Sequence, residues 1–150
     1  MLSWLGKKLI AYNMRKASEG EIGPLLRMDA KDIRFRFPGD NSWGGVIDGK
    51  AELETWLRRF AEVGIRIWPD EVVLKGFPWK QTICVRGRNY LESPEGERVY
   101  ENRYVIWGQI RWGLLRDYEV YEDTESSRAL DRYLASRGDP LSQRAIGSDS

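Results

Sequence analysis

The segment from Arg98 to Thr124 constrains the fold more than any other part of this 150-residue chain. Side chains alternate in two long runs, and the sequence Arg111-Trp112-Gly113 lies between them, with a glycine that can take positive φ. This alternation is typical of β-strands, so the segment predicts a hairpin of two long strands. Aromatic residues occur on both sides of each strand. We therefore expect one face of the sheet to meet a core and the other face to meet a partner.

The remainder of the chain predicts helices first and strands afterwards. Apolar residues at helical spacing indicate helices at about 2–16 and 22–28, and a third helix that begins near residue 48 and is buried through Leu53, Trp56, Leu57 and Phe60. Strands are expected at Ile33–Phe37, at Ile65–Leu74 with an edge or a bulge at Pro69, and at Trp79–Leu91. A last helix is expected to begin at Asp123 or Thr124 and to end before Gly138 and Pro140.

Helices that lie on one side of a mostly antiparallel sheet define the α+β fold class. A long twisted sheet curls, so its concave side must be filled by helices or must enclose a cavity. We expect one domain over residues 1–138. The remaining residues, 139–150, are polar and lack periodicity, so we expect a disordered tail.

Composition excludes several kinds of site. The 24 Lys and Arg residues nearly balance the 23 Asp and Glu residues, and the net charge of +1 predicts no nucleic-acid partner and no membrane partner. Histidine is absent, which excludes Ser-His-Asp triads and His-ligated metal sites within one chain. There is no glycine-rich phosphate loop, so we expect no metal, no nucleotide and no other cofactor.

The single cysteine and the N-terminal sequence bear on location. Cys84 lies in an apolar strand, where a buried, inert thiol is the expected state, and one cysteine cannot form an intrachain disulfide. Lys7 and Lys8 interrupt the first apolar run before it reaches the length of a signal peptide. We therefore expect a cytoplasmic protein.

Four segments carry a resemblance to a known family: Asp32–Gly39, Gly49-Lys50, Tyr100–Tyr104 and Tyr118–Thr124. With these segments and the order of its elements, the chain resembles the nuclear transport factor 2-like superfamily over residues 1–138, and within it the SnoaL-like proteins, which include polyketide cyclases and ketosteroid isomerase-like enzymes. The resemblance implies a cone-shaped, curved, mostly antiparallel sheet (an α+β barrel) wrapped by N-terminal helices. It also implies a deep pocket inside the cone and a homodimer formed through the convex face of the sheet.

The resemblance also places the family's acid–base residues. The general base of the isomerases corresponds to Phe37, the Arg-x-Asp motif of the epoxide hydrolases to Asn102 and Tyr104, and the aspartate of the last strand to Val120. None of these positions holds a carboxylate. The resemblance therefore supports a pocket and argues against those reactions by those residues.

The polar candidates for catalysis are Tyr104, Tyr118 and Asn102, which the resemblance places inside the pocket. They could hold a ligand oxygen, or they could simply satisfy one another and nearby backbone groups. The candidates for ligand binding are Tyr12, Phe37, Trp43, Trp56, Phe60, Ile106, Arg116 and Val120.

Some of these residues have simpler explanations. Arg116 shares a strand face with Tyr118 but could lie at the wet rim of the sheet, and Trp43 could close the pocket or plug the core. Tyr12 could point inward, although helical periodicity alone explains its place.

Three hypotheses of function follow. The first is a cofactor-independent enzyme that isomerises, dehydrates, cyclises or hydrolyses a small apolar metabolite. The second is a non-catalytic module that binds such a molecule, and the third is a protein-interaction module. In each case we expect a homodimer whose outer strand faces carry Val105, Trp107, Leu115 and Tyr121.

Overall fold

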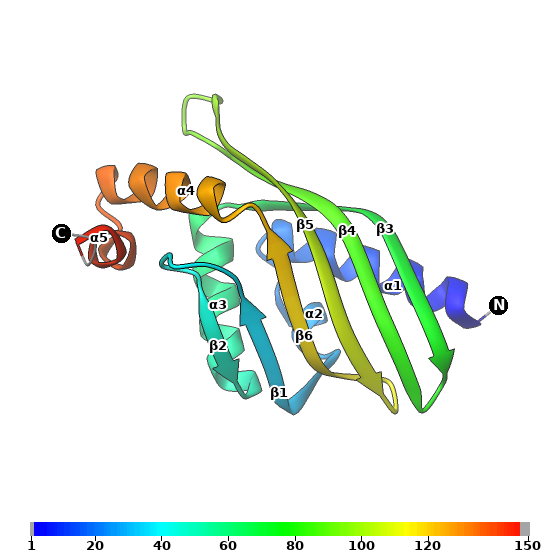
Figure 1. The fold of residues 1–150 in the computed structure, drawn as a ribbon. Coiled ribbons are helices and arrows are strands. Elements are labelled where there is room, and N and C mark those ends of the chain that lie inside the picture. Colours follow the sequence, from blue (N-terminus) through cyan, green and yellow to red (C-terminus); the bar gives the residue numbers. More distant parts are fainter. Residues whose placement is uncertain (1, 148–150) are drawn as a thin grey trace.

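A curved, six-stranded sheet forms the body of the molecule in the computed structural model, which describes residues 2–147 (Figure 1). The strands lie in the order β2-β1-β6-β5-β4-β3. Their bounds are Asp29–Phe37 (β1), Gly45–Asp48 (β2), Arg66–Phe77 (β3), Lys80–Glu92 (β4), Arg98–Arg111 (β5) and Leu114–Glu122 (β6). Neighbouring strands are antiparallel except β1 and β6, which are parallel. The predicted α+β class and mostly antiparallel curved sheet are confirmed, and the sheet does not close into a full barrel.

The predicted hairpin is β5 and β6. Trp112 and Gly113 form its two-residue turn, and both have positive φ, at 51° and 78°. Positive φ at both central residues is the type I′ geometry that matches the right-handed twist of paired strands. Pro69 lies on the edge strand β3, where the register with β4 shifts between Pro69 and Glu71, as its sequence predicts.

Helices cover the concave face of the sheet. Helix α1 (Leu2–Ser18) packs along β3, the short α2 (Gly23–Leu26) follows it, and α3 (Lys50–Val63) lies over β1 and β2. Leu53, Leu57 and Phe60 of α3 are buried, as predicted. Figure 1 shows α1 and α3 on the same face of the sheet, over opposite edges of it.

The C-terminal part contains more structure than the sequence predicts. Helix α4 (Thr124–Ser136) begins after Asp123, whose carboxylate accepts a hydrogen bond from the backbone N–H of Glu125 at 3.0 Å. Part of the expected disordered tail is a helix, α5 (Pro140–Gly147), which packs against α4. Polar contacts anchor it, among them an ion pair of 2.9 Å between Arg59 and Asp139. Residues 148–150 of the expected tail lie outside the described residues.

Within residues 2–147, no helix combines the length and the hydropathy needed to cross a membrane.

Candidate functional site

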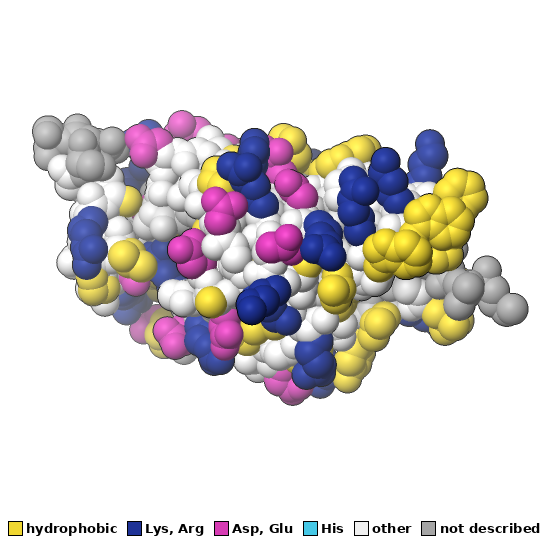
Figure 2. All heavy atoms as spheres, turned by 90° about the horizontal axis from the view of Figure 1, so that it is seen from below, with side chains coloured by type: hydrophobic (Ala, Val, Ile, Leu, Met, Phe, Trp, Pro, Cys, Tyr) yellow, Lys and Arg dark blue, Asp and Glu magenta, His cyan; other side chains and the backbone are white. Residues whose placement is uncertain are grey.

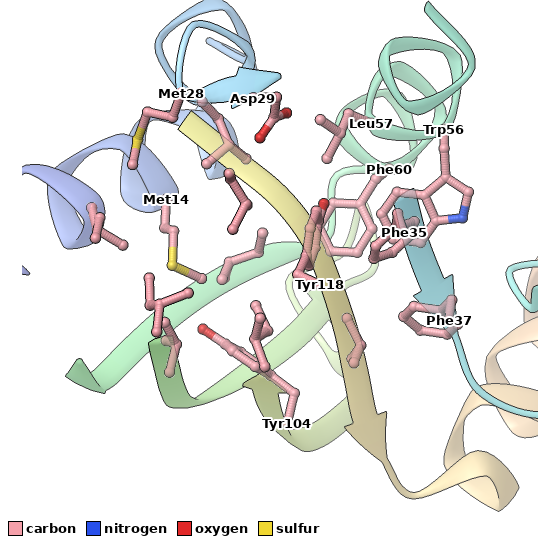
Figure 3. A pocket seen from close by; sticks show the side chains of 18 of the residues that line it. Met14, Met28, Asp29, Phe35, Phe37, Trp56, Leu57, Phe60, Tyr104 and Tyr118 are labelled. Carbon is pink, nitrogen blue, oxygen red and sulfur yellow. The ribbon is translucent and has the colours of Figure 1, made fainter. Parts of the chain in front are cut away.

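A cavity of about 110 Å³ lies between α1, α3 and the concave face of the sheet (Figure 3). Its wall is almost entirely apolar. Helix α1 contributes Ile10 and Met14, and strands β4 to β6 contribute residues such as Ile83, Val85 and Val120. A cavity of ~150 Å³ in another protein accommodates benzene, so this one fits a molecule of about one ring. The flexible thioether side chain of Met14 gives the wall some freedom to adapt.

Aromatic rings form the side of the cavity beneath α3. Phe35 lies with its ring centroid 4.6 Å from that of Tyr118 and 4.9 Å from that of Trp56. Trp56 contacts Phe37 at 5.3 Å and stacks on Phe60 at 5.4 Å. Tilted and stacked rings at these distances attract one another beyond simple area burial. The wall on this side is therefore rigid.

Asp29 is a carboxylate in this apolar wall. It is the first residue of β1, pairs with Leu115 of β6, and is only 4% exposed. Its Oδ2 atom is buried without a hydrogen-bond partner in the protein. Burial raises the pKa of Asp29 to about 7, and the positive charge of Lys50 opposes part of that rise. An acid with this pKa can both accept and donate a proton near neutral pH.

Two tyrosines border the cavity, and each lies opposite a glycine of the neighbouring strand. Tyr104 pairs with Gly87, and Tyr118 pairs with Gly108. A Cβ atom at Gly87 would overlap the Tyr104 hydroxyl and lie 2.6 Å from its Cζ atom, so the missing side chain makes room for the phenol. Burial raises the pKa of both phenols, so they remain protonated and can donate hydrogen bonds. The Tyr104 hydroxyl has no partner within the protein.

A second polar group lies at the end of β6. Ser127 donates a hydrogen bond of 2.6 Å to Oε1 of Glu122, and the amide of Asn89 lies 3.4 Å from Oε2. Burial raises the pKa of Glu122, while the hydrogen bonds from Ser127 and Asn89 oppose that rise. Asn89 and Glu122 both line the cavity, and Oδ1 of Asn89 has no protein partner. Three lining residues therefore present an unpartnered buried polar atom: Asp29, Asn89 and Tyr104.

The structure brings seven of the residues selected from the sequence to the cavity wall. They are Phe37, Trp56, Phe60, Tyr104, Ile106, Tyr118 and Val120. Figure 3 shows that Tyr118 and Tyr104 approach from neighbouring strands, while Trp56 and Phe60 descend from α3. Their position fits a ligand site, and their chemical roles remain proposals.

Asn102 and Tyr12, also selected from the sequence, do not line the cavity. The side-chain amide of Asn102 donates to the carbonyl of Asp123 at 2.9 Å and to the hydroxyl of Tyr100 at 3.1 Å, and its oxygen accepts from the N–H of Arg103. Asn102 therefore joins β5 to the start of α4. Tyr12 is 54% exposed, because the side of α1 that carries Ile10 and Met14 is the one that faces inward.

Trp43 and Arg116 also lie outside the cavity. Trp43 is buried behind Trp56 and Phe60, so it plugs the core instead of closing the pocket. Arg116 forms an ion pair of 2.8 Å with Asp32 outside the cavity. The pairing of β5 with β6 shifts register here, since Ile110 faces Leu115 whereas the preceding Gln109 faces Asp117. This bulge breaks the alternation that placed Arg116 beside Tyr118.

The sequence analysis missed Asp29, Asn89 and Glu122. Alternation could have found Glu122, because it continues the inward series of Tyr118 and Val120 by two residues. Asn89 likewise follows the buried residues Ile83 and Val85 at even spacing on β4. Asp29 lies before the predicted strand Ile33–Phe37, so neither alternation nor helical spacing identified it.

Comparisons with known proteins support the fold. No protein-family model matches the sequence, and no curated protein matches it. Among solved structures, an NTF2-like protein of unknown function from Burkholderia pseudomallei is 21% identical, with a TM-score of 0.61 over 76% of this chain and 90% of the other. An NTF2-like protein from Burkholderia xenovorans is 22% identical, with a TM-score of 0.58 over 78% and 88%. TerC, crystallised with polyporic acid, is 22% identical, with a TM-score of 0.64 over 79% and 91%.

Proposed function

We propose that this chain, which has the nuclear transport factor 2-like fold, binds a small, mostly apolar molecule in the cavity and transfers a proton on it through Asp29. The observation that carries the proposal is the Asp29 carboxyl group, which is buried in an apolar wall, has an unpartnered oxygen and has a pKa raised to about 7. A structural carboxylate would be expected to pair its oxygens. Perturbed acids in cavities are characteristic of catalytic sites.

The surrounding groups fit a reaction at a carbon next to a carbonyl. Asp29 as carboxylate would take the proton from that carbon, and the electrons of the C–H bond would move onto the carbonyl oxygen. The phenol of Tyr118 or Tyr104 would donate a hydrogen bond to this oxygen. In a ligand whose C=C bond is conjugated with the enolate, the electrons would return from the oxygen through that bond, and Asp29 would deliver the proton to its far carbon. The double bond then shifts, which is an isomerisation. If the ligand instead carries a β-hydroxyl group, this group leaves as water with the proton from Asp29, and if it carries a second carbonyl, the enolate carbon attacks that carbonyl and Asp29 protonates the resulting alkoxide, which closes a ring. The protein would need no cofactor for it.

Exchange of protons for deuterium tests the proposal without knowledge of the natural substrate. Cyclohexanone has the size of the cavity and carries exchangeable protons beside its carbonyl. In D₂O at pH 8 the protein is expected to accelerate their loss, followed by ¹H NMR, and the rate should rise with pH through about 7. Binding of cyclohexanone, seen as a thermal shift, without any acceleration would favour the alternative of a non-catalytic binding module. Absence of binding by ring-sized ketones, phenols and hydrocarbons would favour an interaction protein.

Removal of the tyrosine hydroxyls is expected to weaken ligand binding. In Tyr104→Phe and in Tyr118→Phe, the loss of one hydrogen bond of about 1 kcal/mol should reduce affinity for cyclohexanone roughly fivefold. Tyr104→Phe should not lower stability, since its buried hydroxyl has no partner in the protein. Titration calorimetry and urea unfolding measure the two effects.

Tyr100→Phe is the control, because the Tyr100 hydroxyl contacts Asn102 and Glu122 but does not itself line the cavity. It should lower the free energy of unfolding by about 1 kcal/mol and leave affinity unchanged. If Tyr104→Phe and Tyr118→Phe behave like this control, the two residues are core scaffolding.

A homodimer through the outer face of the sheet is part of the same proposal. Trp107 and Tyr121 are each 53% exposed there, and Val105 is 36% exposed, which leaves an apolar surface to be covered. Leu115 does not belong to this surface, because the bulge in β6 turns it to the cavity. Light scattering at micromolar concentration should give twice the 17.5 kDa of the chain, and the mass of the monomer would refute the dimer.

A further inference from the structure

Three exposed aromatic residues form one end of the sheet. Phe77 and Trp79 lie at the β3–β4 turn and Trp112 at the β5–β6 turn, and they are 66%, 51% and 78% exposed. The rings of Phe77 and Trp79 stack with centroids 5.1 Å apart, and the ring of Trp112 lies 6.5 Å from that of Trp79. The N–H of Trp112 donates to the carbonyl of Trp79 at 3.2 Å, which holds the two turns together. We call these three residues the aromatic tip.

Neither burial in the core nor the residue preferences of the turn explain why position 112 is a tryptophan. It is the only residue other than glycine with positive φ in the part of the chain that the structure describes. A bulky residue in this conformation is strained, and the first position of a type I′ turn favours Asn, Asp or Gly. The side chain also buries little surface. A strained, exposed tryptophan indicates a role outside the folded chain.

Helix α1 extends the apolar surface at the same end of the molecule. Trp4, Leu5 and Leu9 are each 55% exposed. Helix α1 packs on β3 so closely that a Cβ atom at Gly6 would lie 3.2 Å from Leu74, three residues before Phe77. Figure 1 shows the N-terminal half of α1 at the end of the sheet where β3 finishes.

Basic side chains are concentrated at the same end. The basic side chains here are Lys7, Lys8, Lys75, Lys80 and Arg111, and none forms an ion pair with an acidic group of residues 2–147. The stretches 4–9, 74–81 and 109–114, which lie at this end, contain no Asp or Glu. Figure 2 shows a dense group of hydrophobic side chains at one end of the molecule with Lys and Arg beside it. The net charge of +1 therefore averages over a strongly uneven distribution.

We propose that the protein docks on the surface of an anionic lipid bilayer through the aromatic tip, the exposed side of α1 and the surrounding Lys and Arg residues. Tryptophan and phenylalanine rings prefer the boundary between lipid headgroups and acyl chains. Lysine side chains can extend from there to the lipid phosphates. This proposal replaces the prediction of no membrane partner, which used only the charge of the whole chain.

A bilayer fits this surface better than other partners do. A second copy of the chain would place like charges opposite one another. Single-stranded nucleic acid would stack its bases on the rings, but Leu5 and Leu9, which belong to the same apolar surface, offer nothing to a base. The β5–β6 turn also borders the cavity, because Gly113 is one of the residues that line the cavity. Docking would therefore hold that end of the cavity at the lipid surface. Docking itself requires no enzymatic activity.

Co-sedimentation with vesicles tests the proposal. The full chain is mixed with vesicles of phosphatidylcholine alone or with 30% phosphatidylserine, in low and in high salt. We expect at least tenfold stronger binding to the anionic vesicles, weakened by salt. Trp79→Ala/Trp112→Ala should reduce binding at least tenfold, and Lys75→Glu/Lys80→Glu should reduce it by a similar factor and remove much of the salt dependence.

The matched control is Trp68→Ala/Val46→Ala, which removes two apolar side chains of similar exposure, 49% and 50%, elsewhere on the surface. It should bind like the unaltered protein. Thermal melting checks that all variants fold. Absence of vesicle binding, equal loss in the control, or tighter binding to a single-stranded oligonucleotide than to anionic vesicles would each overturn the proposal.

Discussion

Asp29→Asn is expected to remove a large part of the pH dependence of stability. The pKa of Asp29 is about 7 in the folded protein and takes the ordinary aspartate value of about 3.9 in the unfolded chain. Between these values the unfolded chain binds fewer protons than the folded one, so stability falls as pH rises from about 4 to 7. The loss is on the order of 4 kcal/mol and stays constant above pH 7. The side chain of the Asp29→Asn variant cannot ionise at this position, so the variant should not lose this stability as the pH rises.

Urea unfolding from pH 4 to pH 8 measures this difference. The two proteins should be similarly stable at pH 4, and the variant should be the more stable one at pH 8. Glu122, whose pKa is also raised, is present in both proteins and cancels in the comparison. In the exchange of cyclohexanone protons, the variant should lose at least about a hundredfold in rate while still binding the ketone. Parallel pH profiles and unchanged exchange would contradict the assignment of Asp29.

Gly87→Ala is expected to cause a large loss of stability through the addition of a single methyl group. Its Cβ atom would overlap the Tyr104 hydroxyl and the backbone carbonyl oxygen of Trp68. The phenol would have to leave its present position at the cavity wall, and the carbonyl belongs to the strand pair β3–β4. Overpacking of this kind costs about 3 kcal/mol. Urea or thermal unfolding measures it.

Gly23→Ala is the matched control for this substitution. The nearest atom to its added Cβ would be Nη1 of Arg27 at 3.6 Å, an ordinary contact. It should change the free energy of unfolding by less than about 0.5 kcal/mol. If Gly87→Ala is equally mild, close packing against Gly87 does not fix the position of the Tyr104 ring. The orientation that we assign to the Tyr104 hydroxyl at the cavity would then be wrong.

The fold could be predicted from the sequence because its strongest signals are local. Alternation over Arg98–Thr124 and the Trp112-Gly113 turn define the hairpin, and Phe35 and Phe37 identify β1. Helix α5 was missed because it has little hydrophobic periodicity, although Asp139 followed by Pro140 is a signal for a helix start. In the structure Asp139 accepts a hydrogen bond from the N–H of Ser142 at 2.8 Å and pairs with Arg59, which is distant in sequence.

The part of the site that strands provide was predictable only where the strands alternate without interruption. Tyr104, Tyr118 and Val120 reach the wall as alternation requires, but one bulge sends Leu115 inward and leaves Arg116 outside. A register shift depends on how two strands twist and pair, which the sequence of one strand does not encode. Asp29 reaches the wall through its parallel pairing with β6, a contact between segments more than eighty residues apart.

The most direct test of the account is the titration of the Asp29 carboxyl group itself. Carbon-13 NMR of protein labelled at aspartate side chains follows this group, and the spectrum of Asp29→Asn identifies its signal. The account predicts a midpoint near pH 7 in the free protein and a displaced midpoint when cyclohexanone is bound. A midpoint near the ordinary value for aspartate, about 4, would show that the carboxyl group is solvated and would contradict its role as an acid–base group.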